Sequence, residues 1–111
     1  MKGFLSLAMA TIAACPAVSF ALSGNTLYPS GVQFEKENPN FESAISYAFI
    51  GYVSGVIDSL DNTAFCLPIT VTYPQAGSIV MKYLRNNPEQ RDRMASKLVV
   101  EALKKPFPCS E

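Results

Sequence analysis

The chain has 111 residues, which is enough for one small domain. Its 9 Lys and Arg residues balance 9 Asp and Glu residues, so it lacks the basic excess that a nucleic-acid-binding domain needs. It contains no His, and this removes the commonest general base and metal ligand in proteins.

Residues 1–21 have the composition of a secretory signal peptide. Lys2 supplies a positive charge, the apolar run FLSLAMATIAA follows, and Ser19 and Ala21 occupy the small-residue positions before a cleavage site. The run is too short to cross a bilayer as a helix. We expect cleavage after Ala21 and no stable membrane insertion of the remaining chain. Two alternatives are lipidation at Cys15, within the sequence IAAC, and an uncleaved anchor.

Cleavage there would remove Cys15 and leave Cys66 and Cys109. An even number of cysteines in an exported chain favours disulfide formation, and two cysteines allow a single pairing. We therefore predict a disulfide between Cys66 and Cys109, with two unpaired buried thiols as the alternative. The bond would close a loop of about 44 residues, for which chain entropy gives roughly 4 kcal/mol of stabilisation.

The first segment after the leader contains helix-forming and helix-breaking signals. Ser23 is a suitable N-cap for a short helical turn, and Pro29 and Gly31 are expected to end that turn. The polar sequence VQFEKENPN, residues 32–40, is predicted to be a surface loop.

A long helix is predicted from Phe41 to Leu60, because apolar residues recur there every three or four positions. Asn40 is the predicted N-cap. The sequence IGYVSGVID lies within this helix.

We interpret Gly51, Tyr52, Gly55 and Asp58 as a helix-packing motif. Each glycine costs about 1 kcal/mol relative to Ala in a helix interior. Two glycines on one face predict that another backbone passes close to them. The favoured partner is a helix of the same chain, and the alternative is a dimer or partner surface.

The sequence FCLPITVTY is the only stretch rich in β-forming residues. Pro68 falls inside it and Pro74 follows it, so we predict an extended connector and not a sheet strand. Thr72 and Gln75 have the spacing of a capping box, which predicts that a helix follows.

The last helix is predicted to begin at the sequence NNPEQ, with Asn87 as cap and Pro88 in the first helical position. Pro106 should end it near Lys105. The predicted fold class is all-α: a small helical bundle of three main helices plus a short N-terminal helix, with one disulfide.

No group of side chains predicts catalysis. Asp58 and Asp61 could form a carboxylate pair, but a solvated helix end explains them more simply. Glu35 and Glu37 lack a third partner that would complete a metal site. We predict that the chain is not an enzyme and binds no metal or other cofactor.

Five short sequences occur in a characteristic order: SGNTLY, IGYVSGVID, FCLP, VTYPQAGSIVMKYLRNNPEQR and MASKLVVEALKKPFPC. Together they resemble the Rap/Tai family of immunity proteins, which accompany type VI secretion effectors in Gram-negative bacteria. The resemblance extends from about Ser23 to Cys109. It implies a periplasmic helical protein that binds a cognate effector toxin, typically a peptidoglycan amidase, covers its active site, and works as a homodimer.

One feature departs from that family. Many members carry a second cysteine pair, whereas this chain has Pro29, Ser30 and Gly31 in the first of those regions and Phe49 in the second. The missing bridge predicts a less firmly attached N-terminal segment and a mobile loop over residues 32–40.

The resemblance does not supply the toxin contacts, so we predict them from the loops. One candidate is the acidic loop of Glu35, Glu37 and Asn38. The other is the loop of Asp61, Asn62 and Thr63. Two competing hypotheses are a periplasmic binding or structural module with no toxin partner, and a small hydrolase.

Overall fold

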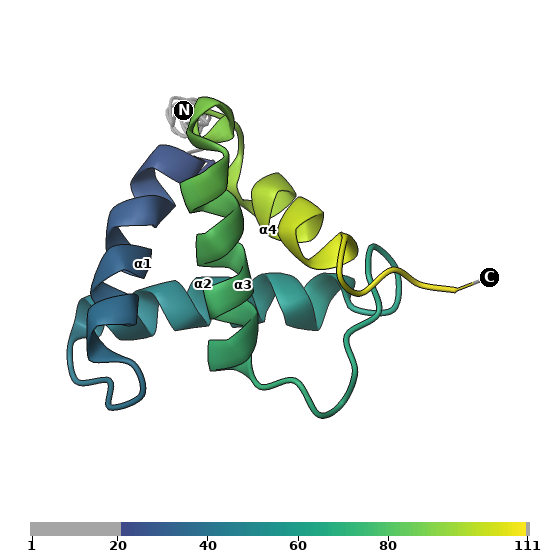
Figure 1. Cartoon of the computed structure of the whole chain (residues 1–111), viewed down its shortest axis with the longest axis horizontal. Helices are drawn as coiled ribbons and strands as arrows, with labels where there is room; N and C mark the ends of the chain where they lie inside the picture. The colour runs from purple at the N-terminus through teal and green to yellow at the C-terminus, as the bar shows by residue number, and fades with distance from the viewer. Residues whose placement is uncertain (1–20, 111) are drawn as a thin grey trace, which may run out of the picture.

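The structure is a computed structural model that describes residues 21–110, and its helices form an all-α fold (Figure 1). The helices are α1 (Gly24–Glu37), α2 (Ala44–Leu60), α3 (Tyr73–Asn86), a 3₁₀ helix η2 (Pro88–Gln90) and α4 (Ala95–Lys104). In Figure 1, α3 crosses in front of α2, and α1 and α4 lie on its two sides. Within the described residues the only β-type pairings are isolated bridges. The predicted fold class is confirmed.

The hydrophobic core lies where the four α-helices meet. Its largest fully buried side chains come from each of the four α-helices and from the segment after α2, and they include Leu27, Phe34, Phe49, Phe65, Met81, Leu84, Leu98 and Leu103. No helix in the described part of the chain is long and apolar enough to cross a membrane.

The prediction for the N-terminal segment is wrong. Residues 24–37 form the single helix α1, which begins at the predicted cap Ser23 and continues through Pro29. Residues 32–37 are therefore the last turns of a helix and not a loop. Phe34 is fully buried and contacts Phe49, so this segment is attached to the core without a second disulfide.

Gly31 is buried in α1 because α1 passes close to α2 and α3. A Cβ atom at this position would lie 2.1 Å from Met81 Sδ and 2.8 Å from Phe49 Cε1. The glycine that was expected to break the helix therefore permits close packing. The cost of Pro29 and Gly31 to the helix is offset by the burial of Leu27 and Phe34.

Helix α2 begins later than predicted, at Ala44 with Ser43 as its cap. The preceding residues have other partners. The Glu37 carboxylate accepts hydrogen bonds from the backbone N–H groups of Glu42 and Ser43, at 2.9 and 3.0 Å. The ring of Phe41 stacks on Phe34 with centroids 5.1 Å apart. Residues 41–43 are thus held against the end of α1 and do not extend α2.

Helix α3 begins as predicted, with a capping box formed by Thr72 and Gln75. Helix α4 does not. The sequence NNPEQ forms only η2, and α4 starts at Ala95. The intervening carbonyl groups bond to the start of α1 instead: Gly24 N–H donates to Arg93 O at 2.9 Å and Asn25 N–H donates to Arg91 O at 2.7 Å.

Candidate protein-binding site

The predicted disulfide is present and ties the C-terminal tail to the connector, which we define as residues 62–72. Cys66 and Cys109 are bonded, with their Cα atoms 4.9 Å apart. The backbone N–H of Cys66 also donates to Phe107 O at 2.9 Å. The fully buried ring of Phe65 holds the adjacent position in the core. The first half of the connector is therefore fixed on both sides.

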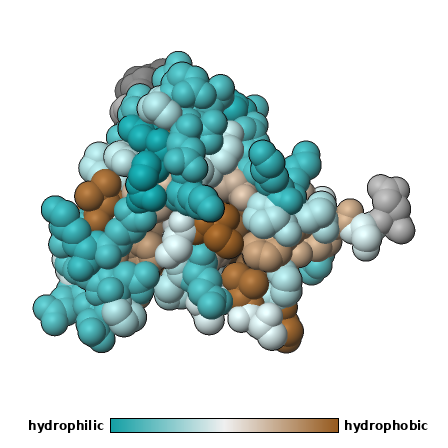
Figure 2. Space-filling view, viewed as in Figure 1, coloured by the Kyte–Doolittle hydropathy of each residue, from teal (hydrophilic) through white to brown (hydrophobic). Residues whose placement is uncertain are grey.

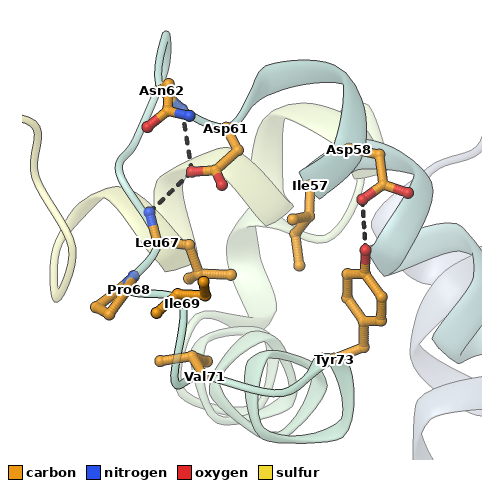
Figure 3. Close-up of a pocket in the computed structure, with 9 residues that line it drawn as sticks. All are labelled: Ile57, Asp58, Asp61, Asn62, Leu67, Pro68, Ile69, Val71 and Tyr73. Atoms are coloured by element: carbon orange, nitrogen blue, oxygen red, sulfur yellow. Dashed lines mark hydrogen bonds between the residues drawn. The ribbon is translucent and has the colours of Figure 1, made fainter.

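Asp61 organises the turn that leads into the connector (Figure 3). Its Oδ1 accepts hydrogen bonds from the backbone N–H groups of Asn62 and Leu67, at 3.0 and 2.8 Å. Asn62 has a φ of 71°, a left-handed conformation that Asn adopts more readily than most residues. The Thr63 hydroxyl donates to Leu60 O at 2.7 Å. Asp61 and Thr63 thus have structural roles, whereas the Asn62 side chain is exposed.

The second half of the connector exposes apolar side chains. Ile69 is 100% exposed and Tyr73, at the start of α3, is 42% exposed. Leu67, Pro68 and Val71 line a hollow of about 520 Å³ beside them, together with Ile57 of α2 (Figure 3). Figure 2 shows apolar surface gathered at the lower right of the view, where Figure 1 places this connector.

Polar groups border the hollow on the α2 side. The Tyr73 hydroxyl donates to Asp58 Oδ1 at 2.5 Å and so joins α3 to α2. This hydrogen bond raises the pKa of Tyr73. Asp61 and Asn62 complete the border. An apolar projection next to carboxylates suits a protein surface that offers an apolar recess and basic groups.

The other predicted contact residues lie elsewhere. Glu35 and Glu37 are at the C-terminal end of α1, and Asn38 follows them, so they lie at the opposite end of α2 from the connector (Figure 1). Helix α2 has 17 residues and is about 25 Å long. The two predicted loops therefore do not form one surface.

The two acidic side chains of that group have partners within the chain. Glu35 forms an ion pair with Arg85 of α3. Glu37 accepts a hydrogen bond from the Gln33 side chain at 2.7 Å in addition to the backbone groups at the start of α2. These hydrogen bonds, with that of Gln33 the largest contributor, hold the pKa of Glu37 well below its ordinary value of 4.5.

The two glycines of the helix-packing motif do not pack against another helix of the same chain, which was the favoured prediction. A Cβ atom at Gly51 or Gly55 would meet nothing within 4 Å, so neither glycine lies against another helix of the described chain. Tyr52 packs partly on the core, and Asp58 bonds to Tyr73. The alternative prediction, that the two glycines form a surface for a second copy or another partner, is therefore still open.

Sequence reasoning missed Ile69 and Tyr73. A signal for them existed: an apolar, β-rich stretch in a connector has no helix face to bury it. The described residues contain no group of three or more Cys, Asp or Glu side chains placed to hold a metal ion.

A comparison with known families gives a match over residues 23–109 to the Rap1a immunity proteins. The chain belongs to the Rap1a immunity protein family. The match spans all four α-helices and both cysteines of the disulfide. Searches of the curated proteins and of the solved structures found no match. Membership of the Rap1a family supports a role in immunity to a type VI effector, and such proteins act by binding a toxin and are not in general enzymes.

Proposed function

We propose that this Rap1a protein binds a peptidoglycan amidase delivered by type VI secretion and blocks its active site in the periplasm. The observation that carries the proposal is the disulfide-anchored connector, which holds the fully exposed side chain of Ile69 away from the core. Ile69 lies in a turn closed by the Val71 N–H, which donates to Pro68 O at 3.0 Å, next to the anchored half of the connector. A projection that is ordered before binding loses little conformational freedom when it enters a cleft. In this proposal the connector blocks the active site sterically. Membership of the family indicates that the partner is an effector toxin.

The test is co-expression in the periplasm with the product of the adjacent gene. Wild-type protein should form a complex and prevent lysis. Ile69→Asp should weaken the complex by about 2 kcal/mol or more, as expected for a central apolar anchor. Met94→Asp is the matched control, because Met94 is also exposed, lies outside the connector and occupies an N-cap position that favours Asp. A hydrolase that lyses cells despite the wild-type protein would refute the proposal.

The periplasmic location rests on the leader sequence and on the start of the fold. Ala95 N–H donates to Leu22 O at 2.7 Å, so the domain uses the first residue that cleavage after Ala21 would retain. Intact-mass measurement of the exported protein should give a chain that begins at Leu22. A chain that begins at a lipidated Cys15 would contradict cleavage after Ala21 and indicate a lipid-anchored protein.

We also propose that two copies associate through the N-terminal half of α2. Ile45 is 54% exposed there, although it is large and apolar, and Ala48, one turn further along the same face of the helix, is exposed too. Sedimentation of wild-type protein should show a dimer, and Ile45→Asp should shift it towards a monomer. Ile69→Asp, which removes an equally apolar group far from this face, should leave the dimer intact.

A further inference from the structure

A second concave surface lies along the junction of α2 and α4. It consists of two adjoining hollows of about 400 and 410 Å³ that share Leu60 and Ser96. None of its lining residues lines the hollow beside the connector. We call it the α2–α4 groove: its α2 wall includes Gly55, Val56 and Leu60, and its α4 wall includes Lys97, Val100 and Lys104.

The α2 wall of this groove is uncharged and sterically open. Helix α2 has no charged residue from Ala44 to Ile57. Leu60 contributes apolar surface to the groove, and Val56, which is 9% exposed, forms part of its floor. Because no atom lies within 4 Å of a Cβ built at Gly51 or Gly55, another chain can approach the backbone there. This wall favours contact with apolar side chains.

The α4 wall is basic. Arg93 and Glu101 pair with each other, with Nη2 and Oε2 2.6 Å apart. Lys97 and Lys104 are exposed, and neither makes an ion pair within the described residues. Three cations and one carboxylate therefore line this wall, and two positive charges are left over.

We propose that the α2–α4 groove docks an acidic amphipathic helix of the effector toxin. The apolar face of that helix would lie on Val56, Leu60 and Val100, and its carboxylates would meet Lys97 and Lys104. The two lysines are separated by two helical turns, or about 10 Å, so carboxylates two turns apart on the partner can reach both. The inference rests on the proposed function and adds a second contact, separate from the connector.

A second copy of the chain fits this groove less well. In a two-fold symmetric dimer each copy presents the same surface, so the Lys97 and Lys104 side chains of both copies would share one interface. The α2 wall offers no carboxylate to receive them. Like charges that lose solvent in this way oppose association.

The experiment uses the product of the adjacent gene, purified in a catalytically inactive form, and titrates it calorimetrically into the full mature chain. The double variant Lys97→Glu/Lys104→Glu should bind about ten-fold more weakly or worse, and its affinity should depend less on salt than that of wild type. The control is Lys36→Glu/Lys82→Glu, which changes the net charge equally but lies outside the groove. Carbodiimide coupling of the wild-type complex should join Lys97 or Lys104 to Asp or Glu of the effector.

The outcomes separate this inference from the proposed function. If wild type binds and the groove variant binds equally well, the groove inference is overturned and the proposed function stands. If the groove variant changes only the oligomeric state, a second copy occupies the groove and the inference is wrong. If wild type does not bind the effector at all, the proposed function fails and the groove inference fails with it.

Discussion

At the scale of single residues, glycines on adjacent helices have opposite roles. Gly31 has Met81 and Phe49 where its Cβ would be, whereas Gly55 faces open space. The sequence shows only that both are glycines in helical segments. Their neighbours decide whether a methyl group would be excluded or tolerated.

Gly31→Ala should therefore destabilise the fold by about 1–3 kcal/mol, the usual cost of overpacking a core. Gly55→Ala should stabilise it by up to about 1 kcal/mol, because Ala favours a helix and nothing opposes its side chain. Urea unfolding of the two variants measures both effects. Equal shifts in the same direction would contradict the packing described for Gly31.

Glu101 links stability to pH. It accepts hydrogen bonds from Arg93 and Tyr83, which lower its pKa to about 2 from an ordinary 4.5. A carboxyl group with a lower pKa in the folded state stabilises the fold above its unfolded pKa, and this stabilisation disappears as the pH falls towards the folded pKa.

We expect Glu101→Gln to be less stable than wild type at neutral pH, with a difference that shrinks between pH 4.5 and about 2. Urea unfolding at a series of pH values measures it. Glu42→Gln is the control, because the Glu42 side chain is exposed and makes no hydrogen bond within the described residues. A difference that stays constant across this range would argue against the Arg93–Glu101 interaction.

At the scale of elements, local signals predicted α3 well and the other helix boundaries less well. The capping box of Thr72 and Gln75 is completed within the helix that it starts, so sequence alone locates it. The starts of α2 and α4 are set by contacts with α1: Glu37 binds the residues before α2, and the first turn of α1 binds the carbonyls of Arg91 and Arg93. The contacts before α4 join segments far apart in the sequence, and the Glu37 contacts form only because α1 continues to Glu37, so neither follows from a local pattern.

Sequence reasoning located only part of the candidate site, because the rest of it also depends on contacts between segments. The two cysteines and Asp61 could be placed in one region from sequence. The apolar composition of the connector hinted that some of its side chains are exposed, but it could not single out Ile69, because that depends on how Cys66 and Phe65 hold the connector.

The disulfide is the element-scale contact that fixes this connector. Replacing both cysteines, Cys66→Ser/Cys109→Ser, should cost about 4 kcal/mol through loop-closure entropy. Amide hydrogen exchange should increase first in the connector and after Lys104, where the bond joins segments with few other contacts. Unchanged exchange in both segments would show that other contacts hold them.

At the scale of the whole molecule, two separate concave surfaces lie beside α2. One is formed with the connector and has Asp58 and Asp61 at its border, and the other is formed with α4 and has Lys97 and Lys104. Two surfaces of opposite charge give one orientation of a partner an advantage over its reverse. This arrangement favours a specific protein partner over a small-molecule ligand.

Periplasmic co-expression with the adjacent gene product, scored by cell lysis, tests the immunity function most directly. Wild-type protein should prevent lysis, Met94→Asp should also prevent it, and Ile69→Asp should lose protection while it remains folded. Lysis in the presence of folded wild-type protein would contradict the immunity function. Full protection by Ile69→Asp would contradict the role of the connector.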